Sequence, residues 1–222
     1  MFTRSFIREV PSFQDRSEAG KLLASRLTRY GGRRDVCILA LPRGGVPVGF
    51  EIALALRLPL DVFVVRKLGV PGYEELAMGA VASGGVRLLQ SDVVAAFNIP
   101  PSIIEASTQR ELQEIKRREK LYRGSRPAPV VKDQIVILAD DGLATGSTMR
   151  VAAAALKQQK PAYTIVAVPV ASLERCEELE AEVDEIICAE TPRQFSAVGH
   201  FFKDFSEVTD EIVRELLARL AR

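Results

Sequence analysis

Short apolar runs alternate along the chain with segments in which apolar and polar positions are mixed. Each run is continuous rather than alternating and is bounded by turn residues, which is typical of strands buried on both faces of a parallel sheet. The runs that we expect to form strands are 35–41 (DVCILAL), 60–65 (LDVFVV), 134–139 (QIVILA), 163–170 (YTIVAVPV) and 184–189 (DEIICA). Two further runs, 78–82 and 86–90, are joined by Ser83, Gly84 and Gly85 and predict a hairpin or a bent strand pair.

The segments between the runs have helical periodicity. Residues 15–29 place their apolar side chains on one stripe, with Asp15 and Ser17 as candidate N-terminal caps. Further helices are predicted at 46–57, 102–122, 148–159 and 208–221. The segment 102–122 interleaves charges of both signs, which indicates a solvated face. Strands alternating with helices predict an α/β fold with a doubly wound, mainly parallel sheet flanked by helices.

Composition limits the partners and the compartment. Thirty Lys and Arg against 29 Asp and Glu leave a net charge of +1 over 222 residues, so there is no electrostatic case for nucleic acid or a membrane as the main partner. The longest uncharged stretch, 161–173, is too short to span a bilayer, and residues 1–13 lack the apolar segment of a signal peptide. Three separated cysteines, with Cys37 and Cys188 expected to be buried, predict a cytoplasmic protein without disulfides. We expect one domain over residues 1–222.

Ligands of open parallel sheets bind beyond the carboxyl ends of the strands, so the segments that follow the strands are the place to search for a site. These segments are 42–45 (PRGG), 66–72 (RKLGVPG) and 140–148 (DDGLATGST). One edge of the sheet would thus collect an arginine with two glycines, an Arg–Lys pair before a glycine-containing loop, and two aspartates with a hydroxyl-rich turn. That mixture suits a ligand that carries both phosphates and a diol.

The third segment is the most specific. Its TGST turn runs straight into a predicted helix, so successive N–H groups, hydroxyls and the helix dipole would form an anion cradle. The lysine of a nucleotide-triphosphate P-loop is absent. Asp140 and Asp141 would repel an anionic ligand unless they accept hydrogen bonds from it, as a ribose 2′,3′-diol allows. The residues therefore predict a ribose-5-phosphate site, and the alternative is a pair of solvated acids that cap the next helix.

The stretch 136–148 (VILADDGLATGST) resembles the phosphoribosyl-diphosphate-binding motif of type I phosphoribosyltransferases: four apolar residues, two acids and a short TG-containing loop. LPRGG is similar to the pyrophosphate loop of that family, and VRKLGVPG is similar to the start of its flexible catalytic loop. The resemblance covers about residues 35–190, and the whole chain looks most like uncharacterised bacterial members. It implies a core at about 35–190 and a small hood formed by about 1–34 and 191–222.

The resemblance implies a role for each matched residue. Asp140 and Asp141 would hold the ribose hydroxyls, and Arg66 and Lys67 could neutralise the leaving group, although Lys67 could also merely end a strand. The 5′-phosphate would be held by Ala144, Thr145, Gly146, Ser147 and Thr148. The pyrophosphate would be held by Arg43, Gly44 and Gly45. Pyrophosphate would be displaced from ribose C1 by a nitrogen nucleophile, with Mg²⁺ arriving on the diphosphate.

Two positions depart from the family pattern. Gly142 stands where a branched apolar residue is usual, and Ala144 stands where hypoxanthine-type enzymes have an acid that faces the base. The loop therefore shows no base-activating group, and the general base is unassigned. On the acceptor side, Phe195 or Phe201 is a candidate for stacking on a base, with core packing as the alternative. The acceptor is not identified, and a homodimer is expected only from the resemblance.

Two functions follow from these residues. The first is a Mg²⁺-dependent phosphoribosyltransferase acting on a nitrogenous base or a similar small acceptor. The second is a regulatory protein that binds phosphoribosyl diphosphate without catalysis. A regulator that binds nucleic acid should have a basic face or a winged-helix segment, and neither is visible, which favours the enzyme. A hydrolase using the two aspartates is disfavoured, because the loop lacks the Asp-x-Asp or metal-ligand spacing.

Overall fold

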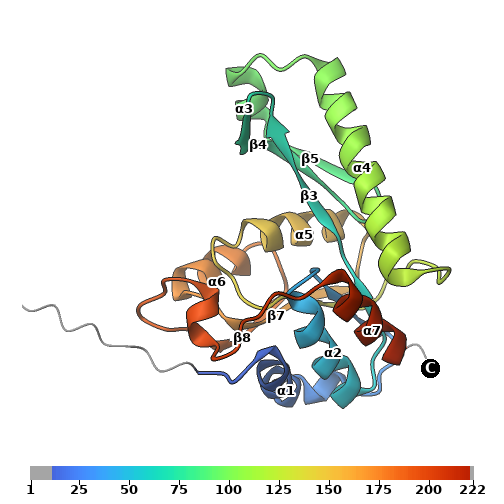
Figure 1. Cartoon of the computed structure of the whole chain (residues 1–222), viewed down its shortest axis with the longest axis vertical. Helices are drawn as coiled ribbons and strands as arrows, with labels where there is room; N and C mark the ends of the chain where they lie inside the picture. Colours follow the sequence, from blue (N-terminus) through green and yellow to red (C-terminus); the bar gives the residue numbers. More distant parts are fainter. Residues whose placement is uncertain (1–11, 221–222) are drawn as a thin grey trace, which may run out of the picture.

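The computed structural model describes residues 12–220. Nearly all of the segment 1–13, where no signal peptide is expected, lies outside these residues. A five-stranded, wholly parallel sheet forms the centre of the molecule, with the strand order β2-β1-β6-β7-β8 (Figure 1). Its strands are β1 (Val36–Ala40), β2 (Leu60–Val62), β6 (Ile135–Ala139), β7 (Tyr163–Val170) and β8 (Glu185–Glu190). Each forms within a residue or so of a predicted run, except that β2 stops at Val62, so the predicted α/β class with a mainly parallel sheet is confirmed.

Helices cover both faces of this sheet (Figure 1). They are α1 (Arg16–Arg26), α2 (Gly45–Leu56), α5 (Ser147–Gln158), α6 (Leu173–Glu180) and α7 (Asp210–Leu220), with short 3-10 turns η1 (Thr28–Tyr30) and η2 (Val198–Phe201). Strand residues alternate between two cores: Ile38 and Ile137 pack with residues of α1, α2 and α7, whereas Leu39 and Leu138 pack with residues of α5 and α6. This two-sided burial explains why the strands read as continuous apolar runs.

A second unit, which we call the arm, spans residues 65–123 and stands above the central sheet (Figure 1). It contains an antiparallel sheet and two helices: β3 (Val65–Val70), β4 (Tyr73–Ala82), β5 (Val86–Leu89), α3 (Ser91–Ala96) and α4 (Pro101–Arg123). The predicted hairpin is β4–β5. The expectation that 66–72 forms a loop is wrong, because most of it pairs with β4 as β3. The sequence pattern does not indicate this strand because it contains charged residues and because its pairing with β4 shifts register beside Gly69.

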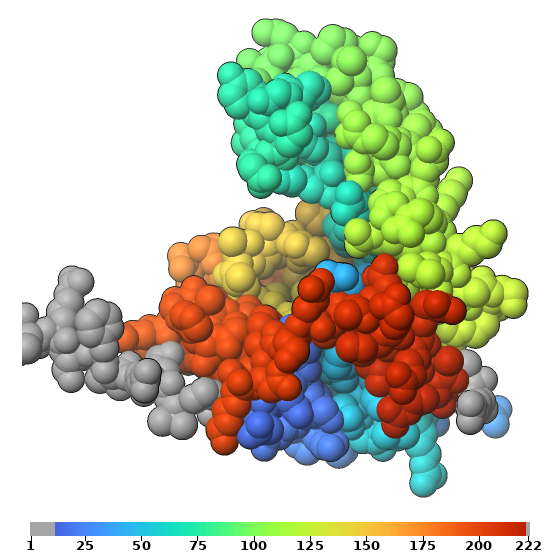
Figure 2. Space-filling view, viewed as in Figure 1, coloured from blue at the N-terminus to red at the C-terminus, as the bar shows by residue number. Residues whose placement is uncertain are grey.

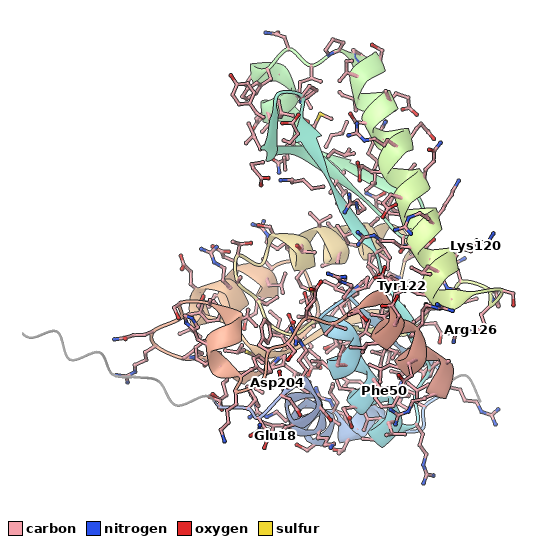
Figure 3. The ribbon with its side chains drawn as sticks, in the orientation of Figure 1. Glu18, Phe50, Lys120, Tyr122, Arg126 and Asp204 are labelled. Carbon is pink, nitrogen blue, oxygen red and sulfur yellow. The ribbon has the colours of Figure 1, made fainter. Side chains whose placement is uncertain are left out.

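One attachment of the arm lies at the end of α4. Arg123 donates through Nε to Asp61 Oδ2 of β2 at 2.8 Å, and the two side chains are only 8% and 12% exposed. One residue earlier, the Tyr122 hydroxyl donates to Asp210 Oδ1 of α7 at 2.6 Å. Figure 3 shows Tyr122 where the end of α4 meets α7. Burial, followed by the hydrogen bond to Asp210, raises the pKa of Tyr122 to about 12, so this hydroxyl keeps its proton at neutral pH.

Two further expectations concern the cysteines and membrane-spanning segments. All three cysteines are free. Cys37 is buried as predicted, whereas Cys188 is only half-buried, because β8 lies at the edge of the sheet. Among residues 12–220, no helix combines the length and apolar character needed to cross a bilayer.

Replacement of Arg123 by Ala should lower the free energy of unfolding by about 3 kcal/mol, because it leaves the Asp61 carboxylate buried and unpaired. Urea denaturation would measure this change. Arg117→Ala is the matched control on the same helix, because Arg117 is 59% exposed and pairs with Glu114 at the surface. The control should stay within about 0.5 kcal/mol of the wild type, and equal effects of the two substitutions would contradict the assignment.

Candidate ribose-phosphate site

The in-register pairing of β1 with β6 brings two of the predicted loops together. Ala40 lies opposite Ala139, so the chain leaves both strands at the same level, at the end of the sheet where ligands of parallel folds bind. The loop 42–45 then lies directly against the acid pair. A Cβ added to Gly44 would be 2.0 Å from Asp141 Oδ2. The predicted pyrophosphate loop and the predicted ribose acids are therefore in contact, and the absence of side chains at 44 and 45 makes this contact possible.

The acid pair itself is largely removed from water. Burial raises the pKa of Asp140 well above the ordinary value, and the neighbouring Asp141 charge raises it further. Burial also raises the pKa of Asp141, but the guanidinium of Arg16 opposes this effect. The Asp140 carboxylate accepts the N–H of Asp141 at 2.9 Å. Two crowded carboxylates of this kind bind donors such as hydroxyls well, because each hydrogen bond relieves the cost of the buried charge.

The TGST turn forms the start of α5. Gly146 occupies the cap position with φ +72°, a left-handed conformation that favours glycine. Thr145 Oγ1 accepts the N–H of Ser147 at 3.3 Å, and the side chains of Thr145, Ser147 and Thr148 are exposed to solvent. No acidic residue lies in the first turn of this 12-residue helix. Exposed hydroxyls and helix N–H groups together make this turn suitable for a phosphate.

The structure explains the glycine that departs from the family pattern. A Cβ on Gly142 would meet Val198 Cγ1 at 2.6 Å and the Val170 carbonyl oxygen at 3.1 Å. Val198 belongs to η2 in the C-terminal part of the chain. The usual branched side chain is therefore replaced by glycine because a side chain from η2 takes up the space beside the loop.

The remaining predicted residues are placed differently. Arg43 pairs through Nη2 with Glu207 Oε1 at 2.5 Å at the rim of the site. Arg66 and Lys67 lie on β3 rather than on a loop: Arg66 Nε donates to the buried Glu111 of α4 at 2.9 Å, and Lys67 pairs with Glu75 at 3.2 Å. Neither of these two contacts the acid pair.

Lys67 nevertheless faces the cradle. It lines a cavity of about 300 Å³ between the arm and α5, and Ser147 and Thr148 line the same cavity. The space-filling view shows the hollow between the arm and the yellow surface of α5 (Figure 2). Of the two basic residues predicted to neutralise a leaving group, Lys67 is therefore the one that shares a cavity with the anion cradle.

Phe195 lies beside the other side of the cradle. Its ring stacks on the buried ring of Phe201, with 5.6 Å between the centroids. Phe195 also lines a cavity of about 670 Å³, together with Ala144 and Thr145 of the cradle and with Arg193. The predicted aromatic residue therefore combines packing with access to an open cavity next to the anion site.

Sequence reasoning missed Arg16. This residue begins α1, and its Nε donates to Asp141 Oδ2 at 2.8 Å. Residues 15–29 predicted only an amphipathic helix, and Arg16 belongs to no motif. The only available signal was electrostatic: two adjacent buried carboxylates require a nearby cation.

The chain is similar to known proteins over most of its length. Residues 13–202 match the family model described as the phosphoribosyl transferase domain. The chain is 39% identical over 210 residues to "Putative phosphoribosyl transferase Rv0571c" of Mycobacterium tuberculosis strain H37Rv, which is 95% of this chain and 47% of the relative. The chain thus spans about half the length of the curated relatives it matches. A crystal structure of TT1426 from Thermus thermophilus is 41% identical, covers 94% of this chain and 98% of its own, and superimposes with a TM-score of 0.81.

The match over 13–202 and the site at the end of the sheet define the class of the protein. The chain belongs to the phosphoribosyl transferase domain family, as the resemblance of its motifs predicted.

The two glycines of the loop should respond differently to Ala. In Gly44→Ala, the new methyl group meets the end of the Asp141 side chain, which can turn away, so stability should change little while the carboxylate moves. In Gly45→Ala, the methyl group meets backbone at the Ala139 carbonyl oxygen, 2.6 Å away, and the free energy of unfolding should fall by about 1–3 kcal/mol. Urea denaturation of both variants is the measurement, and a larger loss in Gly44→Ala would contradict the packing described here.

The raised pKa of Asp140 predicts that Asp140→Asn stabilises the fold at neutral pH. Below the ordinary pKa of 3.8 the carboxyl is protonated in both states and costs nothing. As pH rises above that value, the unfolded chain ionises first, so the wild type loses stability relative to the variant. Thermal unfolding should show a higher melting temperature for the variant at neutral pH, and the difference should shrink towards acid pH. Asp92→Asn, at an exposed site, is the control, and an equal stabilisation by this variant would contradict the explanation from burial.

Proposed function

We propose that the chain is a phosphoribosyltransferase that binds 5-phosphoribosyl 1-diphosphate with Mg²⁺ and transfers the phosphoribosyl group to a nitrogenous base or a similar small acceptor. One observation carries the proposal: two partly buried carboxylates lie against the glycines of the loop 42–45 and directly precede a phosphate cradle in the chain. A diol flanked by two anionic groups matches this arrangement of acceptors and donors. A ligand that carried only phosphate groups would be repelled by two carboxylates and would not need them.

Each part of the ligand has a place in this site. The ribose hydroxyls donate to Asp140 and Asp141, and the 5′-phosphate accepts from the N–H groups and hydroxyls of 144–148. The diphosphate lies against the loop of Arg43, Gly44 and Gly45, where the missing side chains let backbone N–H groups approach. These contacts fix ribose C1 relative to the leaving group, which lowers the barrier through orientation.

The reaction displaces pyrophosphate from C1 by a nitrogen nucleophile through a cationic, oxocarbenium-like state. Negative charge that develops on the leaving oxygens needs cationic neighbours. Lys67 is the nearer candidate, because it shares the cavity with Ser147 and Thr148, while Arg66 would first have to leave Glu111. In the described residues no group of three or more His, Cys, Asp or Glu could hold a metal by itself. Mg²⁺ would therefore be held mainly by diphosphate oxygens and water.

The acceptor would enter the cavity of about 670 Å³ beside the cradle. Phe195 would stack on a planar ring there, supported from behind by Phe201. A regulatory protein that binds the same ligand without catalysis is the second candidate. It is favoured by one observation: Ala144 stands where hypoxanthine-type enzymes have an acid that faces the base, so the loop supplies no base-activating group.

Calorimetric titration with phosphoribosyl diphosphate and Mg²⁺ tests the site. We expect the wild type to bind and Asp140→Asn/Asp141→Asn to bind at least about a hundredfold more weakly, because two charge-assisted hydrogen bonds are lost. Asp92→Asn/Asp133→Asn removes the same charge at exposed positions and should bind like the wild type. A folded wild type that does not bind would refute the proposal. Pyrophosphate release with a panel of bases then separates the enzyme from the regulator, which would bind without releasing it.

A further inference from the structure

Arg16, near the start of the described residues, connects the acid pair to the C-terminal segment 204–207. Its Nε donates to Asp141 Oδ2 at 2.8 Å, and its Nη1 donates to the carbonyl oxygen of Ser206 at 2.9 Å. Its guanidinium carbon lies 3.7 Å from the centroid of the Phe205 ring. The Arg16 side chain is only 12% exposed. The Arg16 side chain therefore joins the acid pair to the C-terminal segment through two hydrogen bonds and a contact with an aromatic ring.

The oxygen that Arg16 holds is also the one closest to the pyrophosphate loop. Asp141 Oδ2 lies 2.0 Å from the position of a Cβ on Gly44. Arg16 and Gly44 thus both lie against a single carboxylate oxygen. The direction of this carboxylate decides how much space remains above the loop and where its other oxygen points.

The charges around Asp141 come from four elements. Asp140 follows β6, Arg16 begins α1, Arg43 belongs to the loop after β1, and Asp204 and Glu207 lie in the C-terminal segment. Glu207 is paired with Arg43. Two hydrogen bonds from Ser206 lower the pKa of Asp204, and the charge of Arg16 lowers it further. Within residues 12–220, Arg16 is thus the cation with a direct contact to the acid pair. Its charge favours the ionised form of Asp141 against the effect of burial.

The C-terminal segment, like Asp141, holds Arg16 in place. Asp204 N–H donates to the carbonyl oxygen of Gln14 at 2.8 Å, so the segment runs alongside the start of α1. Figure 3 shows Asp204 close to Glu18 of α1. Lysine could pair with Asp141, but it has no planar fork that reaches a carboxylate and a carbonyl at once while stacking on a ring.

We propose that Arg16 is a positioning residue of the ribose site, which keeps Asp141 ionised and turned so that it can accept a ribose hydroxyl. This inference rests on the function proposed above. Arg16 acts through Asp141 and is given no contact with the ligand. The C-terminal segment, through Phe205 and Ser206, sets the position of Arg16.

Arg16→Gln, Arg16→Lys and Arg26→Gln test this role by titration with phosphoribosyl diphosphate and Mg²⁺ between about pH 6 and about pH 9. Arg26 is the matched control, because it lies on the same helix, is exposed and donates to the Cys188 carbonyl oxygen. Without the charge of Arg16, Asp141 takes up a proton more easily, so Arg16→Gln should weaken binding most at low pH, and binding should recover towards high pH. The dissociation constant of this variant should rise by up to about tenfold for each unit by which the pH falls. Arg16→Lys should restore most of the pH profile, and Arg26→Gln should match the wild type.

A double-mutant comparison separates a positioning role from a structural one. In an Asp141→Asn background, Arg16→Gln should cause no further loss of affinity, because the group through which Arg16 acts is already neutral. A loss that persists in this background, or an Arg16→Gln profile equal to that of the wild type, would overturn the inference. If Arg16→Gln does not fold, the affinity of Arg16→Lys decides: binding weaker than that of Arg26→Gln at an unchanged pH slope supports the role, because lysine keeps the charge but not the fork that orients Asp141, and binding equal to that of Arg26→Gln refutes it. A wild type that fails to bind refutes the proposed function instead.

Discussion

The parallel pairing of β1 with β6 in register is the constraint on which the site depends. Ala40 opposite Ala139 makes the two loops leave the sheet at one level, so that residues about a hundred positions apart in sequence meet within van der Waals distance. A shift of the register by one residue would turn the apolar side chains of β6 to the opposite core. The two cores on either side of the sheet therefore also hold the site loops in place.

The site departs from what stability alone would favour. A carboxylate pair in a largely buried position, next to a loop without side chains, raises the pKa of both acids. A cation from a different element, Arg16, pairs with Asp141 and also lowers the pKa of Asp140, but burial outweighs its effect at both acids. Such local conflicts between packing and charge are typical of binding sites, because the groups are arranged for a ligand and not for the empty protein.

The features that could be predicted from sequence were those contained in one contiguous stretch. The strands were visible because burial on two faces makes apolar runs, and the acid pair and the TGST turn because both lie within nine residues, 140–148. The strand β3 was missed because its pairing depends on β4 and includes a register shift. Arg16 was missed because its partners are 125 and 190 positions away, and no local pattern records such a contact. Gly142 was seen as a departure, but its cause lies in Val198 of a distant turn.

The attachment of the arm has a mechanical consequence. Helix α4 has 23 residues and is therefore about 35 Å long, and its buried ion pair lies at its last residue, Arg123. A rod fixed at one end amplifies rotation: a tilt of about 10° at Arg123 would displace the far end by about 6 Å over that length. The same tilt would change the width of the hollow that Lys67 shares with Ser147 and Thr148. The hollow beside the anion cradle is thus coupled to an angle set by the contacts of Tyr122 and Arg123, at the junction where the arm ends.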